Sequence, residues 1–326
     1  MTMTSCEAES RRINKRLPGV LQQLAIDPSA IALAGQGAAE FPFKVPLSFI
    51  KRMRHGDHAD PLLRQVLPAA DEDLEREGFS ADPLQEQGQA QIPGLLHKYR
   101  GRALLIATGT CAIHCRYCFR RHFPYPEKQD FQPALGYLAQ DTSLHEVILS
   151  GGDPLSLPDS KLGGLIEALA AIPHLQRLRI HSRIPVVLPE RMTPLLIRRL
   201  THSRLPVVMV IHCNHPNEID GEVEQVLSVM HRAGITLLNQ SVLLRGINDD
   251  PEVLAALSER LFAARVLPYY LHLLDPVRGA AHFDVPEPEA QRIMHDLGSR
   301  LPGYLVPRLV REEAGAPYKL NKQAMG

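Results

Sequence analysis

From about residue 96 onward, short apolar runs alternate with stretches of helical hydrophobic spacing, and this alternation constrains the fold of the 326-residue chain more than any other feature. Six runs are predicted to be strands, at 103–107, 145–150, 177–182, 207–213, 236–244 and 269–274. Helices are predicted at about 159–171, 252–264 and 287–299. Two more are marked by apolar stripes, one of Met192, Leu195, Leu196 and Leu200 and one of Val223, Val226, Leu227, Met230 and Ala233. Apolar strands that alternate with helices indicate a parallel sheet covered by helices, either a barrel or a doubly wound open sheet.

The first 95 residues have a different character. They are predicted to form a helical N-terminal extension, 1–95, that packs on a main domain of residues 96–326. Helical spacing occurs at 11–24 and 47–53, whereas 57–61 and 93–94 carry the glycine or proline of turns. The acidic stretch 71–77 predicts a helical face that is exposed to solvent.

Three of the five cysteines, Cys111, Cys115 and Cys118, fall within eight residues with the spacing C-x3-C-x2-C. A short loop of this kind can direct three thiolates at one metal centre, and a [4Fe–4S] cluster held by three cysteines keeps one iron open. Zinc is the rival occupant, but structural zinc sites normally close four ligands with paired short spacings. No second pair of that kind follows, and Cys6 and Cys213 stand alone.

Composition and charge exclude several classes of function. Lysine plus arginine equals aspartate plus glutamate at 36 each, which argues against electrostatic capture of nucleic acid. No apolar run reaches the roughly 18 residues needed to span a bilayer, so no membrane contact is expected. The first 18 residues lack the apolar core of a signal peptide, and the odd cysteine count argues against a disulfide framework. We therefore expect a cytoplasmic protein.

Polar residues collect where the predicted strands end. The sequence Ser150-Gly151-Gly152-Asp153-Pro154 follows the second strand, Ser182 and Arg183 end the third, 213–218 follows the fourth, and Asp275 ends the sixth. In parallel barrels the carboxyl ends of the strands carry the catalytic groups. One shared active site at that end is therefore predicted, and the glycine pair would let a ligand approach the backbone closely.

The cysteine spacing, Tyr117 before the third cysteine and the strand–helix pattern resemble the radical S-adenosylmethionine (SAM) superfamily. Further motifs narrow the resemblance to the lysine 2,3-aminomutase family over roughly residues 95–320. These motifs lie at 98–102, 118–121, 181–187, 215–218, 244–249 and 274–283. The resemblance implies a partial (β/α)6 barrel of the TIM type, a [4Fe–4S] cluster on the three cysteines, SAM, and pyridoxal 5′-phosphate (PLP).

The resemblance also assigns residues to the two organic cofactors. Lys319 matches the lysine that holds PLP, although its surroundings are less glycine-rich than in the family, and Lys322 is the neighbour with which it could be confused. Cofactor-binding positions are predicted at Lys98, Tyr99, Arg102, Ser150, Gly151, Gly152, Asp153, Ser182, Arg183, His215 and Gln240. Lys98 stands where the family has an arginine, so it would meet the PLP phosphate as a point charge without a fork.

For the substrate, Arg120 matches the arginine that pairs with the α-carboxylate, and Asp275 matches one of two aspartates that hold the ε-ammonium. Glu312 stands at the position of the second aspartate. A retained carboxylate favours a cationic substrate side chain over that of glutamate. The implied reaction is the radical 1,2-amino shift that converts free L-lysine to (R)-β-lysine, with a reducing electron donor supplying the cluster.

Residues 305–312 resemble the short bacterial form of the family, whose product is attached to elongation factor P by a separate lysine ligase. Seven residues follow Lys319, and we expect no cysteine-bearing C-terminal extension of the kind found in the catabolic clostridial-type enzymes. Three alternatives stay open at this stage: a catabolic lysine or other amino-acid 2,3-aminomutase, a radical SAM enzyme without PLP, and a metal-stabilised binding protein. A homo-oligomer is compatible with the sequence.

Overall fold

The protein is described by a computed structural model that covers residues 13–14, 16–87, 92–126 and 130–323. Its centre is a nine-stranded sheet in which spatial order follows chain order without exception. Seven strands run parallel: β4 (Arg102–Thr108), β5 (Glu146–Gly151), β6 (Arg177–Ser182), β7 (Val207–His212), β8 (Thr236–Val242), β9 (Leu267–His272) and β10 (Arg308–Arg311). The edges are antiparallel: β3 (Leu95–Tyr99) beside β4, and β11 (Leu320–Asn321) beside β10.

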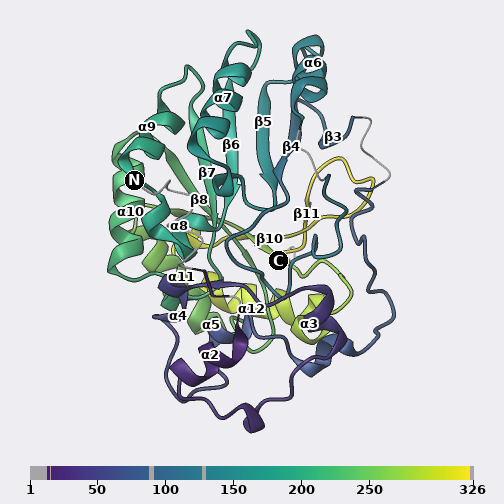
Figure 1. Cartoon of the computed structure of the whole chain (residues 1–326), viewed down its shortest axis with the longest axis vertical. Helices are drawn as coiled ribbons and strands as arrows, with labels where there is room; N and C mark the ends of the chain where they lie inside the picture. The colour runs from purple at the N-terminus through teal and green to yellow at the C-terminus, as the bar shows by residue number, and fades with distance from the viewer. Residues whose placement is uncertain (1–12, 15, 88–91, 127–129, 324–326) are drawn as a thin grey trace.

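Helices follow the strands along the chain. They are α6 (Gln132–Gln140), α7 (Asp159–Ala170), α8 (Ile184–Val187), α9 (Pro194–Thr201), α10 (Gly221–Arg232), α11 (Pro251–Ala263) and α12 (Glu287–Arg300). Crossovers between parallel strands are right-handed. In a sheet whose strand order never reverses, the crossover helices therefore all lie on one face, and the sheet curves so that this face is on the outside. Figure 1 shows α7, α9 and α10 along the outer side of the strands. The sequential order is that of a barrel and excludes the doubly wound sheet, in which the strand order reverses.

The sheet is not closed by strand pairing, but its two edges face each other. Lys98 on edge strand β3 lies 3.2 Å from the carboxylate of Glu312, which directly follows β10. Glu312 also pairs with Lys319, directly before edge strand β11, at 2.8 Å. Ion pairs between side chains therefore connect two edges of the sheet that backbone hydrogen bonds do not join. A barrel that is open between its edge strands agrees with the predicted partial (β/α)6 barrel.

The segment before the sheet contains short elements that Figure 1 shows gathered at the bottom of the molecule. They are β1 (Ile13–Asn14), β2 (Val45–Pro46), α2 (Leu17–Gln23), α3 (Gln36–Glu40), α4 (Leu47–Ile50) and α5 (Pro61–Arg64). Within the described residues there are also seven short 3-10 helices, at Pro28–Ala30, Ala70–Asp73, Pro154–Ser156, Pro189–Arg191, Pro216–Glu218, Ala281–Phe283 and Gly303–Leu305. Phe49 and Leu63 of this segment are fully buried and join the same apolar cluster as Leu105 and Val147 of the sheet.

Several local expectations differ from the structure, among them that Ala233 belongs to a buried helical stripe: it is exposed and follows the end of α10. The helix predicted at 11–24 is shorter, because β1 is extended and α2 begins only at Leu17, with a proline in its first turn; residues 11, 12 and 15 lie outside the described residues. Leu195 does not belong to the buried stripe of α9, because the residue is 48% exposed. Ile197 is buried instead. Of the acidic stretch 71–77, only residues 71–73 are helical, as part of a 3-10 turn, and Glu72 is buried rather than exposed.

No helix within the described residues is long and apolar enough to cross a membrane.

Candidate active site

A cavity of about 630 Å³ opens at the carboxyl ends of the parallel strands. Its wall contains nearly all the side chains that the sequence singled out: Lys98, Tyr99, Arg102, Cys111, Cys115, Cys118, Arg120, Ser150, Gly151, Gly152, Asp153, Ser182, Arg183, Gln240, Asp275, Glu312 and Lys319. His215 is the exception. It is not part of the cavity wall, and its Nδ1 accepts a hydrogen bond from the backbone N–H of Asn217 at the start of a 3-10 helix.

The three cysteines of the loop reach the cavity together. Burial raises the pKa of the Cys111 thiol well above its ordinary value, and burial together with Cys115 raises the pKa of Cys118 to about 11. The thiol of Cys115 accepts a hydrogen bond from Nη1 of Arg183 at 2.7 Å. Cys213 lies apart from them: it is fully buried, and its thiol faces the carbonyl oxygen of His215.

The donor chemistry of this loop fits an iron–sulfur cluster, since such clusters are held by cysteine thiolates. The arrangement is not pre-assembled, however. Among the described residues, no three Cys, His, Asp or Glu side chains stand close enough together to hold a metal ion as they are. The Cys115 thiol is engaged by Arg183, so it would have to turn toward its two neighbours when a cluster binds.

The glycine pair after β5 lies against the start of the cysteine loop. A Cβ atom on Gly151, whose φ is +117°, would stand 2.5 Å from the carbonyl oxygen of Thr108. A Cβ atom on Gly152 would stand 2.5 Å from that of Thr110. Only residues without a side chain allow this approach, and it places the backbone after β5 directly beside the segment that leads into Cys111.

Asp153 joins the ends of β5 and β6. Its carboxylate accepts hydrogen bonds from the Ser182 hydroxyl at 2.7 Å and from the backbone N–H groups of Arg183 at 2.8 Å and Ile184 at 3.1 Å. Burial nevertheless raises its pKa to about 6. The carboxylate of Asp153 and the hydroxyl of Ser182 therefore bind each other in the structure and fix the shape of the cavity wall.

A chain of ion pairs runs across the cavity. Glu86 binds Arg120 through two bonds, Nε at 2.7 Å and Nη2 at 3.0 Å, and binds the Lys98 ammonium at 3.0 Å. Glu312 binds Lys98 at 3.2 Å and Lys319 at 2.8 Å. Burial opposes ionisation of Glu312, but Lys319 and Lys98 hold the pKa of its carboxyl well below the usual range. Glu312, expected to face a substrate ammonium, is thus neutralised by lysines of its own chain.

Asp275 is a carboxylate of the cavity wall whose surroundings differ from those of Glu312. The residue as a whole is only partly buried, but its Oδ1 is buried and has no hydrogen-bond partner among the described residues. Burial raises its pKa to about 7, although Lys319 acts in the opposite direction. A buried acid without a partner is costly, so this position can gain much from a cation that enters the cavity.

The cations of the wall suit anionic ligands. Lys98, Arg102, Arg120, Arg179 and Lys319 line the same cavity. The guanidinium of Arg102 lies over the ring of Tyr99, 4.6 Å from its centroid, and so is held in place by an aromatic face. The two cations Lys98 and Arg102 and the hydroxyl of Tyr99, near the open edge of the sheet, fit a phosphate dianion, and the amine of Lys319 lines the same cavity.

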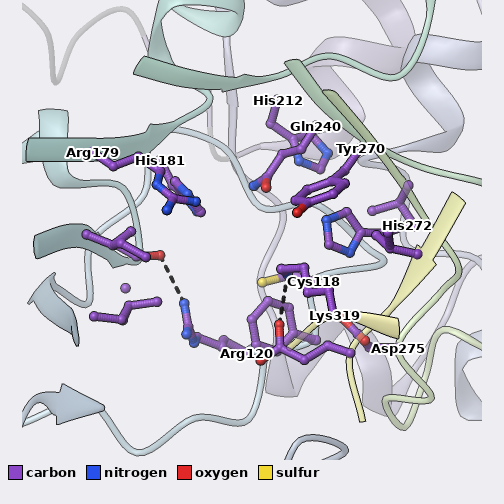
Figure 2. Close-up of a pocket in the computed structure, with 18 of the residues that line it drawn as sticks. Cys118, Arg120, Arg179, His181, His212, Gln240, Tyr270, His272, Asp275 and Lys319 are labelled. Carbon is purple, nitrogen blue, oxygen red and sulfur yellow. Dashed lines mark hydrogen bonds and ion pairs between the residues drawn. The ribbon is translucent and has the colours of Figure 1, made fainter. Parts of the chain in front are cut away.

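Sequence reasoning missed several residues of the wall: Glu86, Arg179, His181, His212, Tyr270 and His272. Figure 2 shows the three imidazoles and Tyr270 facing the same space as Cys118 and Lys319. Burial lowers the pKa of His212 to about 3 and lowers the pKa values of His181 and His272 well below the ordinary value, so all three are neutral. The alternation of side chains between the two faces of a strand could have identified some of them. In β6, Arg179 and His181 lie on the face opposite to that of the buried Leu178 and Ile180.

Known proteins were compared with this chain. It is 52% identical over 305 residues to the L-lysine 2,3-aminomutase of Escherichia coli strain K12, covering 92% of this chain and 89% of that protein. The L-lysine 2,3-aminomutases of Haemophilus influenzae and Buchnera aphidicola are 51% and 46% identical, each over 86% of this chain and 84% of its own length. No protein-family model matches. A solved radical SAM methyltransferase from Sphaerobacter thermophilus is 15% identical with a TM-score of 0.47, covering 67% of this chain and 68% of that one.

Proposed function

Since this chain belongs to the L-lysine 2,3-aminomutase family, we propose that it moves the α-amino group of free L-lysine to the neighbouring carbon and releases (R)-β-lysine. The observation that carries the proposal is the meeting of three kinds of group in one cavity: the thiols of the cysteine loop, the amine of Lys319 and the carboxylate of Asp275, whose Oδ1 has no hydrogen-bond partner in the described part of the chain. A binding protein with a structural metal would not need the second and third of these.

The proposed cofactors are a [4Fe–4S] cluster on Cys111, Cys115 and Cys118, SAM, and PLP on Lys319. When bound, the cluster and SAM supply a carbon radical that removes hydrogen from an unactivated carbon, and PLP stabilises the unpaired electron that results. Lys98, Tyr99 and Arg102 are proposed to bind the PLP phosphate. SAM is proposed to lie against the part of the wall formed by residues 150–153, Ser182, Arg183 and Gln240. His215 is proposed to affect SAM binding only indirectly, because its side chain is not part of the cavity wall.

The residues of the chain orient the substrate. Arg120 is proposed to bind the α-carboxylate through Nη1, which now contacts the Ser150 hydroxyl at 3.2 Å, while its other two nitrogens stay on Glu86. Asp275 is proposed to accept the ε-ammonium, which lowers its pKa and ionises it. The neutral histidines and buried apolar strands around them keep water away from the reacting carbon.

Glu312 has a different proposed part from the family's second aspartate. Its contacts with Lys98 and Lys319 suit a counter-charge that keeps both ammonium groups in place. With Glu312 neutralised, Asp275 alone defines the preference for a cationic side chain. Glutamate, whose side chain carries a carboxylate, would be repelled by Asp275 and is not an expected substrate.

We further propose that β-lysine is consumed by a separate ligase that attaches it to elongation factor P in the cytoplasm. The order of steps can be tested directly. Purified protein is given either free L-lysine or elongation factor P that already carries lysine, and each is analysed for the β-isomer. Rearrangement of the attached lysine alone would overturn the proposed order.

The experiment that tests the activity is an anaerobic assay of reconstituted protein with PLP, SAM, a strong reductant and L-lysine, analysed for β-lysine and 5′-deoxyadenosine. Lys319→Ala is compared with Lys322→Ala. The two side chains are equally accessible, at 21% and 20%, but Lys322 pairs with Glu313 and Glu287 and does not line the cavity. Loss of β-lysine in the first variant alone is expected. Formation of 5′-deoxyadenosine without β-lysine in the parent protein would refute the substrate or the PLP assignment, and equal loss in both variants would refute the choice of lysine.

A further inference from the structure

Glu72 is a fully buried acid that contacts two arginines of the cysteine loop. Its Oε1 accepts a hydrogen bond from Nε of Arg116 at 2.7 Å, and its Oε2 accepts from Nη2 of Arg116 at 2.5 Å and from Nη2 of Arg121 at 2.8 Å. The side chains of Glu72, Arg116 and Arg121 are 0%, 0% and 1% exposed. Arg116 lies between the second and third cysteines, and Arg121 follows the third by three residues.

The remaining bonds of the two arginines extend this contact to the backbone. Arg116 also donates to the carbonyl oxygens of Phe41 and Gly37. Arg121 donates to the carbonyl oxygens of Arg116 and Gly279. The guanidinium groups therefore connect the cysteine loop to the N-terminal segment on one side and to the loop after β9 on the other.

The backbone of the cysteine loop is held by the same N-terminal segment. The N–H of His114 donates to the carbonyl oxygen of Lys44 at 2.9 Å, and the N–H of Arg116 donates to that of Gln65 at 2.8 Å. The imidazole of His114 stacks on Phe41, with ring centroids 4.5 Å apart. The loop is consequently shaped by residues that precede the sheet, and Glu72 is the only acid among the described contacts that neutralises its two arginines at this point.

We propose that Glu72 is a positioning residue for the metal site: by neutralising Arg116 and Arg121 it holds the backbone between Cys111 and Cys118 in the shape that presents three thiols to the cavity. This inference rests on the proposed cluster-binding function of the loop. Without the carboxylate, two buried guanidinium groups would repel each other beneath the loop, and an uncompensated buried charge forces the surrounding chain to move. The three thiols would then no longer be presented together to the cavity.

The test compares Glu72→Gln with Glu146→Gln. Glu146 is a matched control because its carboxylate also binds two arginines, Arg177 at 2.9 Å and Arg179, but it lies at the amino end of β5, whereas the glycine pair beside the cysteine loop lies at the carboxyl end of that strand. Both variants and the parent protein are reconstituted anaerobically with iron and sulfide, well below their unfolding temperatures. Iron and sulfide per folded chain, the electron paramagnetic resonance signal of the reduced cluster, and the unfolding temperature are measured for each.

Glu72→Gln is expected to bind iron about tenfold or more weakly, as changes outside the ligands of a metal site commonly do, and to alter the resonance signal. Glu146→Gln is expected to unfold at a lower temperature but to keep the iron content and signal of the parent. Equal iron content and an unchanged signal in Glu72→Gln would overturn the proposal. If that variant does not fold, Glu72→Asp, which keeps the charge but shortens its reach, is judged by the same criterion. A parent protein that binds no iron would instead refute the proposed cluster.

Discussion

At the scale of single residues, the arrangement around Arg120 shows how the cavity prepares a cation for an anionic ligand. Glu86 occupies two of the three guanidinium nitrogens of Arg120, and both side chains are nearly fully buried. The third nitrogen, Nη1, faces the Ser150 hydroxyl and the cavity. A buried bidentate pair fixes the plane of the guanidinium, so Glu86 orients Arg120 rather than blocking it.

Replacing Glu86 with glutamine is therefore expected to raise KM for lysine by on the order of tenfold, because a hydrogen bond to a charged group is worth roughly 1.5–3 kcal/mol and about 1.4 kcal/mol corresponds to tenfold. Steady-state kinetics over a range of lysine concentrations measure the change. Glu289→Gln serves as the control, since Glu289 also binds an arginine, Arg245, through two bonds but on the protein surface. A lower KM in Glu86→Gln would mean that the carboxylate competes with the substrate instead.

Asp275 gives a prediction of how stability depends on pH. Its pKa is raised by burial from 3.8 to about 7 in the folded chain. Between these two values the folded protein holds a proton that the unfolded chain has lost, so the contribution of Asp275 to stability falls as pH rises through this window. Above pH 7 the cost reaches its full size, a few kcal/mol at about 1.4 kcal/mol per pKa unit.

Asp275→Asn stays neutral at every pH, and it is expected to raise the unfolding temperature more at pH 8 than at pH 5. Thermal unfolding of both proteins at the two pH values, without ligands, measures this difference. The same increase at both pH values would show that the carboxyl is ionised throughout and has an ordinary pKa.

At the scale of elements, the turn after β5 depends on the absence of a side chain. Gly152→Ala would place a methyl group 2.5 Å from the backbone oxygen of Thr110, which must shift the segment leading into Cys111. We expect a lower unfolding midpoint in urea and weaker SAM binding, measured by calorimetry. Gly164→Ala in α7 is the control: a Cβ there meets nothing within 4 Å, so stability should rise by about 0.5–1 kcal/mol. Unchanged stability in Gly152→Ala would show that the two backbones can separate freely.

Of the six central strands, β4 to β8 could be predicted from sequence because each is buried on one or both faces, and β9 because its short apolar run is bounded by turn residues. Their carboxyl ends were placed too late in the fourth, fifth and sixth runs, where β7, β8 and β9 end at His212, Val242 and His272. There the chain leaves the sheet while its residues are still apolar, because these residues pack in two apolar clusters, Leu243 and Leu273 in one and Leu244 and Leu274 in the other. Strands β3, β10 and β11 were not predicted, since they are short and are defined by their pairing with neighbouring strands rather than by an apolar pattern.

The same distinction separates the site residues that were predicted from those that were not. Cysteine spacing and a glycine pair are rare enough to be recognised locally, and Lys319 followed from the family resemblance. Glu72 and Glu86 carry no such signal, because an acid in a polar stretch looks like a surface residue until a partner 44 or 34 positions away buries it. Charge pairs over such distances are a property of the folded chain and cannot be derived from periodicity.

At the scale of the whole molecule, the N-terminal segment and the barrel are predicted to unfold as one unit. Phe49 of α4 is fully buried, belongs to the apolar cluster that includes β4 and β5, and lies under the guanidinium of Arg183 at 5.4 Å from its ring centroid. Removing a buried phenylalanine side chain costs about 3–5 kcal/mol. If the N-terminal segment and the barrel share one core, backbone amides of the sheet lose as much protection from hydrogen exchange as amides of α4.

Hydrogen exchange followed by mass spectrometry can measure this. In Phe49→Ala, peptides that contain β5 and peptides that contain α4 are expected to lose protection by the same free energy, in a single cooperative opening. Phe262→Ala is the control, because Phe262 is 42% exposed on α11 and should change protection little. Loss of protection confined to α4 and its neighbours, with β5 unchanged, would mean that the extension can detach while the barrel stays folded. The cysteine loop would then lose its support without global unfolding, and Glu72 would act on the metal site through a separable part of the protein.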